Sequence, residues 1–187
     1  MDPRHRAGAH RHCASLRPGA SGGLPDDPLG RCAELLAECE REAPRLREGG
    51  RLVEVPVCYE IPFALDMAEV AEKTGLAPAE IARRHAAVEH RVLMVGFSPG
   101  QPYLGGLDPK LSLARRATPR ARVPAGSVAI ANAQTAIYSF ETPGGWNVIG
   151  RTPLSLFDPR REPPSLLAPG DRVRFVPIDA AQFARLK

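Results

Sequence analysis

The sequence predicts a mainly β protein that folds as one compact barrel. Gly and Pro recur every several residues between positions 95 and 152, in strings such as GFSPGQPYLGGLDP and TPGGWNVIGRT. Because Gly permits positive φ and Pro fixes φ, such strings mark frequent tight turns. Between the turns, segments 127–131, 134–139 and 146–152 alternate or run apolar at strand length. The Pro-Gly-Gly at 143–145 is typical of a hairpin connection between two of these strands.

Length and composition favour one main domain, and they argue against nucleic-acid binding, metal binding and a membrane span. The chain has 187 residues, 43% of them hydrophobic, which is enough for one sizeable core. Its 25 Lys and Arg against 21 Asp and Glu give a net charge of only +4, without the concentrated basic face that nucleic acid requires. The 4 Cys show no C-x-x-C spacing, and no run approaches the ~18 apolar residues of a membrane span. Since a signal peptide is also missing, we expect a cytoplasmic protein with reduced thiols.

The N-terminal part differs in character from the rest. Residues 1–25 are basic, Gly-rich and without apolar periodicity, so they are predicted to be a disordered tail. Residues 26–50 are expected to hold one amphipathic helix over 28–46, because apolar residues recur there at intervals of three and four. Residues 51–187 then form the barrel domain.

Within that domain the predicted elements follow in order. Segment 51–59 alternates as a strand, and Pro56 suggests that it lies at an edge. Segments 66–74 and 78–87 are predicted helices separated by Gly75. A strand over 90–97, a helical turn at 108–110 and a strand over 172–178 follow, and Asp179 can cap a short last helix.

Several uncommon strings recur together in this chain: GFSPGQPYLGGL, RRATPRARVPAGSVAIA, QTAIY, TPGGWNVIGRTPL and PGDRVRFVPI. In order and spacing they resemble the family of the 5-oxoprolinase B subunit, the kinase inhibitor KipI and allophanate hydrolase subunit 1. This family corresponds to half of a carboxyltransferase-type domain. The resemblance implies a cyclophilin-like β-barrel with a short helical insert, and it makes the 28–46 helix a remnant of a small α/β domain that precedes the barrel.

The same resemblance implies a function. It favours the B subunit of an ATP-dependent 5-oxoprolinase, which converts 5-oxoproline, a cyclic amide, to glutamate together with subunits A and C. On this interpretation the isolated chain is inactive, and ATP is used by the complex. One alternative is the allophanate hydrolase and urea carboxylase branch, with biotin as the carrier. Another is a KipI-like inhibitor that binds a sporulation histidine kinase.

Large polar residues beside the turns are the candidates for chemistry, because no nucleophile elbow or phosphate loop is present. As catalytic residues we consider His85, a candidate general base, and the guanidinium groups of Arg120 and Arg151, which can hold a carboxylate. Each has a structural alternative, a helix-end contact for the histidine and loop carbonyls for the arginines. The substrate-binding candidates are Tyr103, Arg116, Gln134, Tyr138, Trp146 and Thr152.

Two of these candidates have equally plain structural interpretations. Gln134 can bind an amide through its donor and acceptor faces, or it can cap a turn. Trp146 can stack on a flat ring, although a core position is the better expectation.

Overall fold

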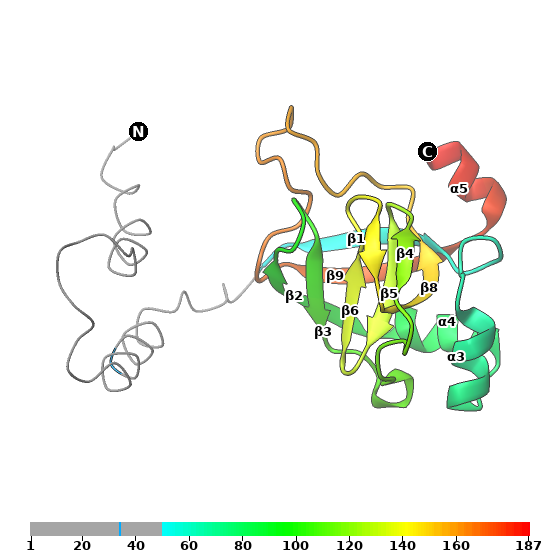
Figure 1. Cartoon of the computed structure of the whole chain (residues 1–187). Coiled ribbons are helices and arrows are strands. Elements are labelled where there is room, and N and C mark those ends of the chain that lie inside the picture. Colours follow the sequence, from blue (N-terminus) through cyan, green and yellow to red (C-terminus); the bar gives the residue numbers. More distant parts are fainter. Residues whose placement is uncertain (1–33, 35–49) are drawn as a thin grey trace, which may run out of the picture. The chain divides into compact units, whose positions relative to one another are not determined.

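The computed structural model describes residue 34 and residues 50–187 (Figure 1). The predicted tail, and the predicted 28–46 helix apart from Glu34, lie outside the described residues. The chain divides into two compact units, Met1–Pro44 and Arg45–Lys187, and the second contains the described residues 50–187. No helix among the described residues has the length and apolar character needed to cross a bilayer.

The second unit is a closed β-barrel, so the predicted mainly β fold is confirmed. Its strands close in the order β1-β8-β5-β6-β3-β2-β9. They are β1 (Leu52–Cys58), β2 (Glu89–Val95), β3 (Pro102–Gly105), β5 (Ser127–Ala131), β6 (Gln134–Ile137), β8 (Asn147–Arg151) and β9 (Arg172–Ile178).

Closure depends on the parallel pairing of β1 and β9 along their whole length, from Leu52 opposite Arg172 to Cys58 opposite Ile178. On its other side β1 meets β8 only at Cys58 opposite Arg151. The sequence predicts an edge strand from Pro56, and β1 is instead part of the closed barrel. Pro56 is tolerated because most of β1 makes no ladder with β8.

The expected helical insert is present between β1 and β2. It consists of α3 (Met67–Thr74) and α4 (Pro78–Ala87), separated by Gly75 in a left-handed C-cap with φ of 68°. Figure 1 shows the two helices together at one end of the barrel. A short 3-10 turn, η2 (Pro109–Leu111), and the C-terminal helix α5 (Ala180–Leu186) complete the helical elements of this unit, and Asp179 caps α5 through a capping box.

A separate two-stranded ribbon lies outside the barrel, made of β4 (Arg120–Val123) and β7 (Thr142–Gly144). It corrects the predicted hairpin: the Pro-Gly-Gly does not join two barrel strands, and its first two residues belong to β7, where Gly144 lies opposite Arg120. The strands on either side of it, β6 and β8, both pair with β5 instead of with each other.

Strand β5 shows how the core is divided. All five of its residues are buried. Val128 belongs to a hydrophobic cluster with valines of other barrel strands, and Ile130 belongs to a second cluster with residues of α3 and α4. Ala129 and Ala131 belong to a third cluster, which includes Tyr138. Because side chains alternate along a strand, the third cluster lies on the opposite face of the barrel wall. This face carries the candidate site.

Candidate functional site

A cleft of about 340 Å³ opens above the third cluster. Four aromatic side chains line it: Phe97, Tyr103, Tyr138 and Trp146. Gln101, Arg115, the β7 residues Pro143 and Gly144, and Gly145 complete most of its wall. The cleft therefore unites three of the predicted substrate-binding residues: Tyr103 of β3, Tyr138 just after β6 and Trp146 just before β8.

The aromatic floor is well defined. The Tyr103 and Trp146 rings meet edge to face, with centroids 5.7 Å apart. The Arg115 guanidinium carbon lies 5.7 Å from the Trp146 ring centroid, a cation–π arrangement that places positive charge at the cleft. At the rim, Phe97 is 73% exposed and has φ of 70°. A bulky residue rarely adopts this left-handed conformation.

Tyr138 lies against the ribbon. A Cβ atom at Gly144 would be only 2.2 Å from the Tyr138 hydroxyl oxygen, so this phenol requires a glycine in β7. Burial raises the pKa of Tyr138, and a hydrogen bond with the Trp146 backbone lowers it in part. The phenol is therefore neutral at physiological pH and can act as a hydrogen-bond donor.

Gln101, which the sequence analysis did not select, connects the cleft to two half-buried hydroxyl groups. It is 2% exposed. Its Nε2 donates to the Tyr103 hydroxyl at 3.1 Å, and its Oε1 accepts from the Ser98 hydroxyl at 3.2 Å. Ser98 also contacts the Ser139 hydroxyl at 2.8 Å. Because Gln101 follows Pro-Gly, its sequence context indicated only a turn.

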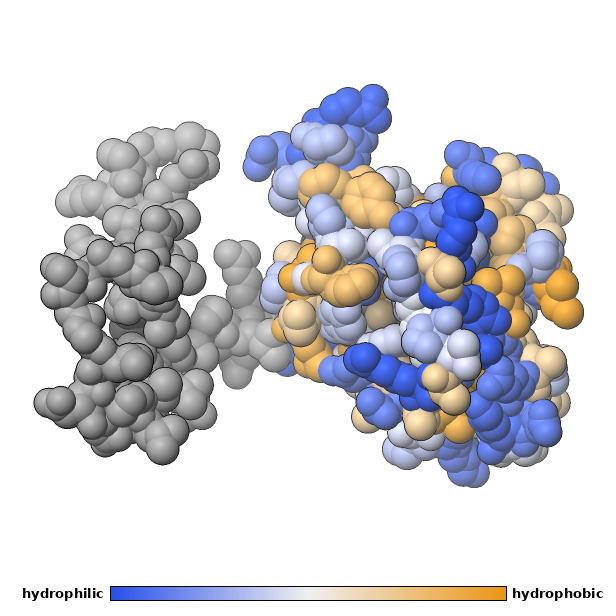
Figure 2. Space-filling view, viewed as in Figure 1, coloured by the Kyte–Doolittle hydropathy of each residue, from blue (hydrophilic) through white to orange (hydrophobic). Residues whose placement is uncertain are grey.

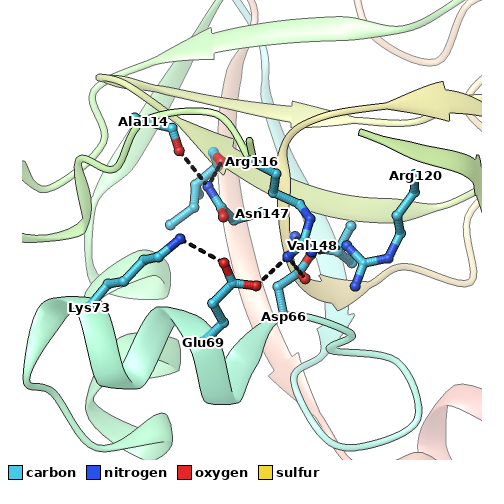
Figure 3. Close-up of polar contacts among 9 residues, drawn as sticks. Asp66, Glu69, Lys73, Ala114, Arg116, Arg120, Asn147 and Val148 are labelled. Atoms are coloured by element: carbon cyan, nitrogen blue, oxygen red, sulfur yellow. Dashed lines mark hydrogen bonds and ion pairs between the residues drawn. The ribbon is translucent and has the colours of Figure 1, made fainter. Parts of the chain in front are cut away.

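Two predicted arginines, Arg116 and Arg120, lie in an ion-pair cluster around Asp66 (Figure 3). Asp66 is 2% exposed and directly precedes α3. Its carboxylate accepts from Arg116, from Arg120 at 2.7 Å and from the Val148 backbone N–H at 2.7 Å. Arg116 also pairs with Glu69 of α3. The cluster thus joins the helical insert, β8 and the segment that leads into β4 and ends at its first residue, Arg120.

That segment, residues 114–120, forms part of the cleft wall. Asn147 donates from Nδ2 to the Ala114 carbonyl at 3.0 Å, and the Arg116 backbone N–H donates to the Gly145 carbonyl at 2.8 Å. Arg115 and Pro119 line the cleft, whereas Arg116 and Arg120 bind Asp66. Sequence reasoning selected the second pair and missed Arg115.

His85 is fully buried in the protein interior. Its ring nitrogens contact the Tyr59 hydroxyl at 2.8 Å and the Thr135 hydroxyl at 3.1 Å, and its ring stacks on Phe175 with centroids 4.5 Å apart. Burial, and secondarily the adjacent His90, lower the pKa of His85 well below its usual value. Both of its ring nitrogens have a partner inside the fold, and His85 does not line the cleft.

Arg151 and Thr152 line a different hollow, of about 210 Å³, together with residues of α5. Arg151 donates from Nε to the Ala125 carbonyl at 2.7 Å, which agrees with the alternative that this arginine binds loop carbonyls. Thr152 accepts from the Leu154 backbone N–H at 3.2 Å. Gln134 begins β6 opposite Ala131 and lines neither hollow. The predicted set is therefore dispersed: three residues line the cleft, and the others lie at Asp66, in the interior, at this second hollow or at the start of β6.

A third hollow, an apolar groove of about 580 Å³, lies between α3, α4 and the ends of β1 and β9. Its lining is mostly apolar, with Met67, Pro78 and Ile178 among its residues. No group of three or more His, Cys, Asp or Glu side chains in the described part of the chain could hold a metal ion. The 340 Å³ cleft combines aromatic surface, charge and hydrogen-bond donors, and we treat it as the candidate site.

Comparison with known proteins identifies relatives that share this chain's barrel. A family model described as "Carboxyltransferase domain, subdomain C and D" matches residues 25–167. The chain is 47% identical over 137 residues to the 5-oxoprolinase B subunit of Bacillus subtilis and 49% identical over 144 residues to that of Escherichia coli O157:H7. These matches include 73% and 77% of this chain, but only 57% and 66% of the relatives. The chain thus spans about 60% of the length of these relatives.

Solved structures agree with the sequence comparison. A conserved uncharacterized protein from Pyrococcus horikoshii superimposes with a TM-score of 0.69 at 44% identity, over 81% of this chain and 69% of that one. The urea carboxylase of Kluyveromyces lactis shares the fold alone, with a TM-score of 0.64 at 20% identity over 84% of this chain and 17% of that one. From its family match, its relatives and its barrel, the chain belongs to the family of the carboxyltransferase domain, subdomains C and D.

Proposed function

We propose that this chain provides the barrel of the B subunit in an ATP-dependent 5-oxoprolinase, which opens 5-oxoproline to glutamate together with subunits A and C. The observation that carries the proposal is the identity of 47–49% to three relatives, each named as the B subunit of 5-oxoprolinase. Because the chain spans only part of those relatives, the activity, the substrate and the partners are all proposals for this protein.

The chemistry of the cleft supports a subunit that binds instead of one that hydrolyses alone. The described residues that line it supply aromatic rings, one amide and one guanidinium, but no carboxylate, thiol, imidazole or aliphatic hydroxyl. Such a set can hold a small amide or lactam, and apart from the phenols of Tyr103 and Tyr138 it provides no nucleophile or general base for breaking the ring. We therefore assign the bond-breaking groups to the partner subunits.

ATP is assigned to the assembled complex for a related reason. Nucleotide phosphates are usually held with Mg²⁺ by carboxylates, and the described lining of the cleft has none. When bound to the complex, ATP would supply the driving force for opening a stable lactam. The residues of this chain would hold and orient the lactam beside the partner subunit.

The surface near the cleft suits a partner protein. Phe97 at the rim is 73% exposed, and Met94, which pairs with the cleft residue Tyr103 across β2 and β3, is 51% exposed. Figure 2 shows hydrophobic patches separated by hydrophilic ones on one face of the barrel. Exposed apolar side chains beside a binding cleft are typical of a surface that another subunit covers.

The test is reconstitution. The full chain is expressed with its cognate subunits A and C, and ATP hydrolysis that depends on 5-oxoproline is measured. We expect activity from the complete complex and none from this chain alone or from subunits A and C alone. Turnover by the isolated chain, or a complex that is inactive with 5-oxoproline but carboxylates urea with biotin, would contradict the proposal.

A further inference from the structure

The hydrogen bonds around Gln101 set the direction of the Tyr103 hydroxyl. A phenol has one hydrogen to donate and accepts through its oxygen. The Tyr103 oxygen already accepts from Gln101 Nε2 at 3.1 Å. Its hydrogen is then available for a group in the cleft.

Gln101 is itself held in one orientation. Its Oε1 accepts from the Ser98 hydroxyl, which in turn contacts the Ser139 hydroxyl. A side-chain amide has its acceptor at one end and its donors at the other, so an acceptor occupied by Ser98 directs the NH₂ group to Tyr103. At 2% exposure, water competes little with these bonds.

A buried glutamine is costly unless it is fully hydrogen-bonded, and an apolar residue of similar size would fill the same space without that cost. Gln101 lines the cleft beside Tyr103, but its amide oxygen is already engaged by Ser98 and its amide nitrogen by the Tyr103 hydroxyl. From this arrangement we infer that Gln101 is a positioning residue: it fixes Tyr103 as a hydrogen-bond donor, and the cleft thereby selects small ligands that carry a carbonyl or carboxylate oxygen.

The other cleft groups match the same ligand class. Arg115 places a cation beside the Trp146 ring, which favours a flat ligand with negative charge. A ligand with a lactam carbonyl and a carboxylate on one small ring would use both donors and the aromatic floor. The choice of 5-oxoproline as probe rests on the proposed function, whereas the donor character of the cleft rests on geometry alone.

Trp146 offers a direct readout, since it is the only Trp of the 187-residue chain and lines the cleft. Its fluorescence is followed while the purified full chain is titrated with 5-oxoproline, with 2-pyrrolidinone, which lacks the carboxylate, and with L-proline, which lacks the lactam carbonyl. We expect 5-oxoproline to bind tightest and L-proline at least fivefold more weakly. No response to 5-oxoproline, or equal affinity for L-proline, would overturn the inference.

A double-mutant cycle tests the positioning role. Gln101→Leu should weaken 5-oxoproline binding about fivefold to tenfold in the parent chain and less than twofold in the Tyr103→Phe background, because the glutamine acts through the phenol. Arg122→Ala is the matched control, since Arg122 forms an exposed pair with Glu141 outside the cleft, and it should leave affinity unchanged. Thermal melts confirm that each variant is folded.

The same loss from Gln101→Leu in both backgrounds would overturn the positioning role. This result is separable from the proposed function. An inactive complex combined with a strong Gln101 and Tyr103 coupling would remove the 5-oxoprolinase assignment alone. An active complex without that coupling would remove this inference alone.

Discussion

Replacing Asp66 with alanine should be among the most damaging single changes in the described part of the chain. Asp66 accepts from two arginines and from the Val148 backbone N–H. The unsatisfied N–H in β8 costs about 1–3 kcal/mol. Removing one member of a fully buried ion pair costs about 3–5 kcal/mol, and since the side chains of Arg116 and Arg120 are 20% and 27% exposed, water relieves part of that. We expect a total loss of about 3 kcal/mol.

The assay is chemical denaturation of the purified chain, supported by thermal melting. A loss of about 3 kcal/mol corresponds to a fall in Tm of roughly 6–12 °C for a domain of this size. The control is Glu141→Ala, which breaks the Arg122 pair at side-chain exposures of 79% and 46% and should change stability by less than about 0.5 kcal/mol. An Asp66→Ala variant within about 1 kcal/mol of the parent would refute the reasoning.

Three further predictions concern two buried histidines, a glycine packed against Tyr138 and an arginine bound to a loop carbonyl. Burial lowers the pKa values of His85 and His90 below those of the unfolded chain. The stability that the neutral histidines contribute is therefore complete above pH ~7 and falls as the pH drops through 6.5, by up to about 1.4 kcal/mol per pH unit for each. A urea midpoint that stays constant from pH 7.5 to 5.5 would contradict this. Gly144→Ala should lower the free energy of unfolding by about 1–3 kcal/mol, because the added Cβ would collide with the Tyr138 hydroxyl. Gly145→Ala is the control and should leave thermal melts nearly unchanged, because the nearest atom to its Cβ would be 3.6 Å away. Arg151→Lys should lower Tm, because the 2.7 Å hydrogen bond to a loop carbonyl is lost, and should leave the ligand affinity of the 340 Å³ cleft unchanged. An unchanged Tm with weaker ligand binding would instead show that Arg151 takes part in ligand binding.

Local sequence patterns were sufficient for most elements of the barrel domain. Strand β5 and helix α4 match the predicted segments 127–131 and 78–87, because apolar periodicity and Pro at a first helical turn are local signals. The ribbon of β4 and β7 could not be predicted this way. Its Pro-Gly-Gly resembles a hairpin turn, and only the tertiary fold decides that Gly144 pairs with Arg120.

The candidate site was predicted in part for the same reason. Tyr103, Tyr138 and Trp146 stand out as large residues beside turns, and the structure brings them together. The role of Asp66 depends on Arg116 and Arg120, which lie 50 and 54 residues away along the chain. No local pattern reports a pairing at that separation, so the sequence predicts Arg120 as a catalytic residue and Arg116 as a substrate-binding one, without indicating their ion pairs with Asp66.

One segment, residues 114–120, contributes side chains both to the cleft and to the Asp66 cluster. Residues 114–120 are not helical, and neighbouring side chains point different ways: Arg115 and Pro119 line the cleft, while Arg116 and Arg120 bind Asp66. A partly buried ion-pair cluster is a weak source of stability, because well-packed apolar side chains often do as well. Apolar side chains would hold the segment less directionally than charge-assisted hydrogen bonds do, and Arg115 depends on that direction to reach the face of Trp146. The cluster is therefore best understood as the support that keeps the Arg115 cation in place at the cleft wall.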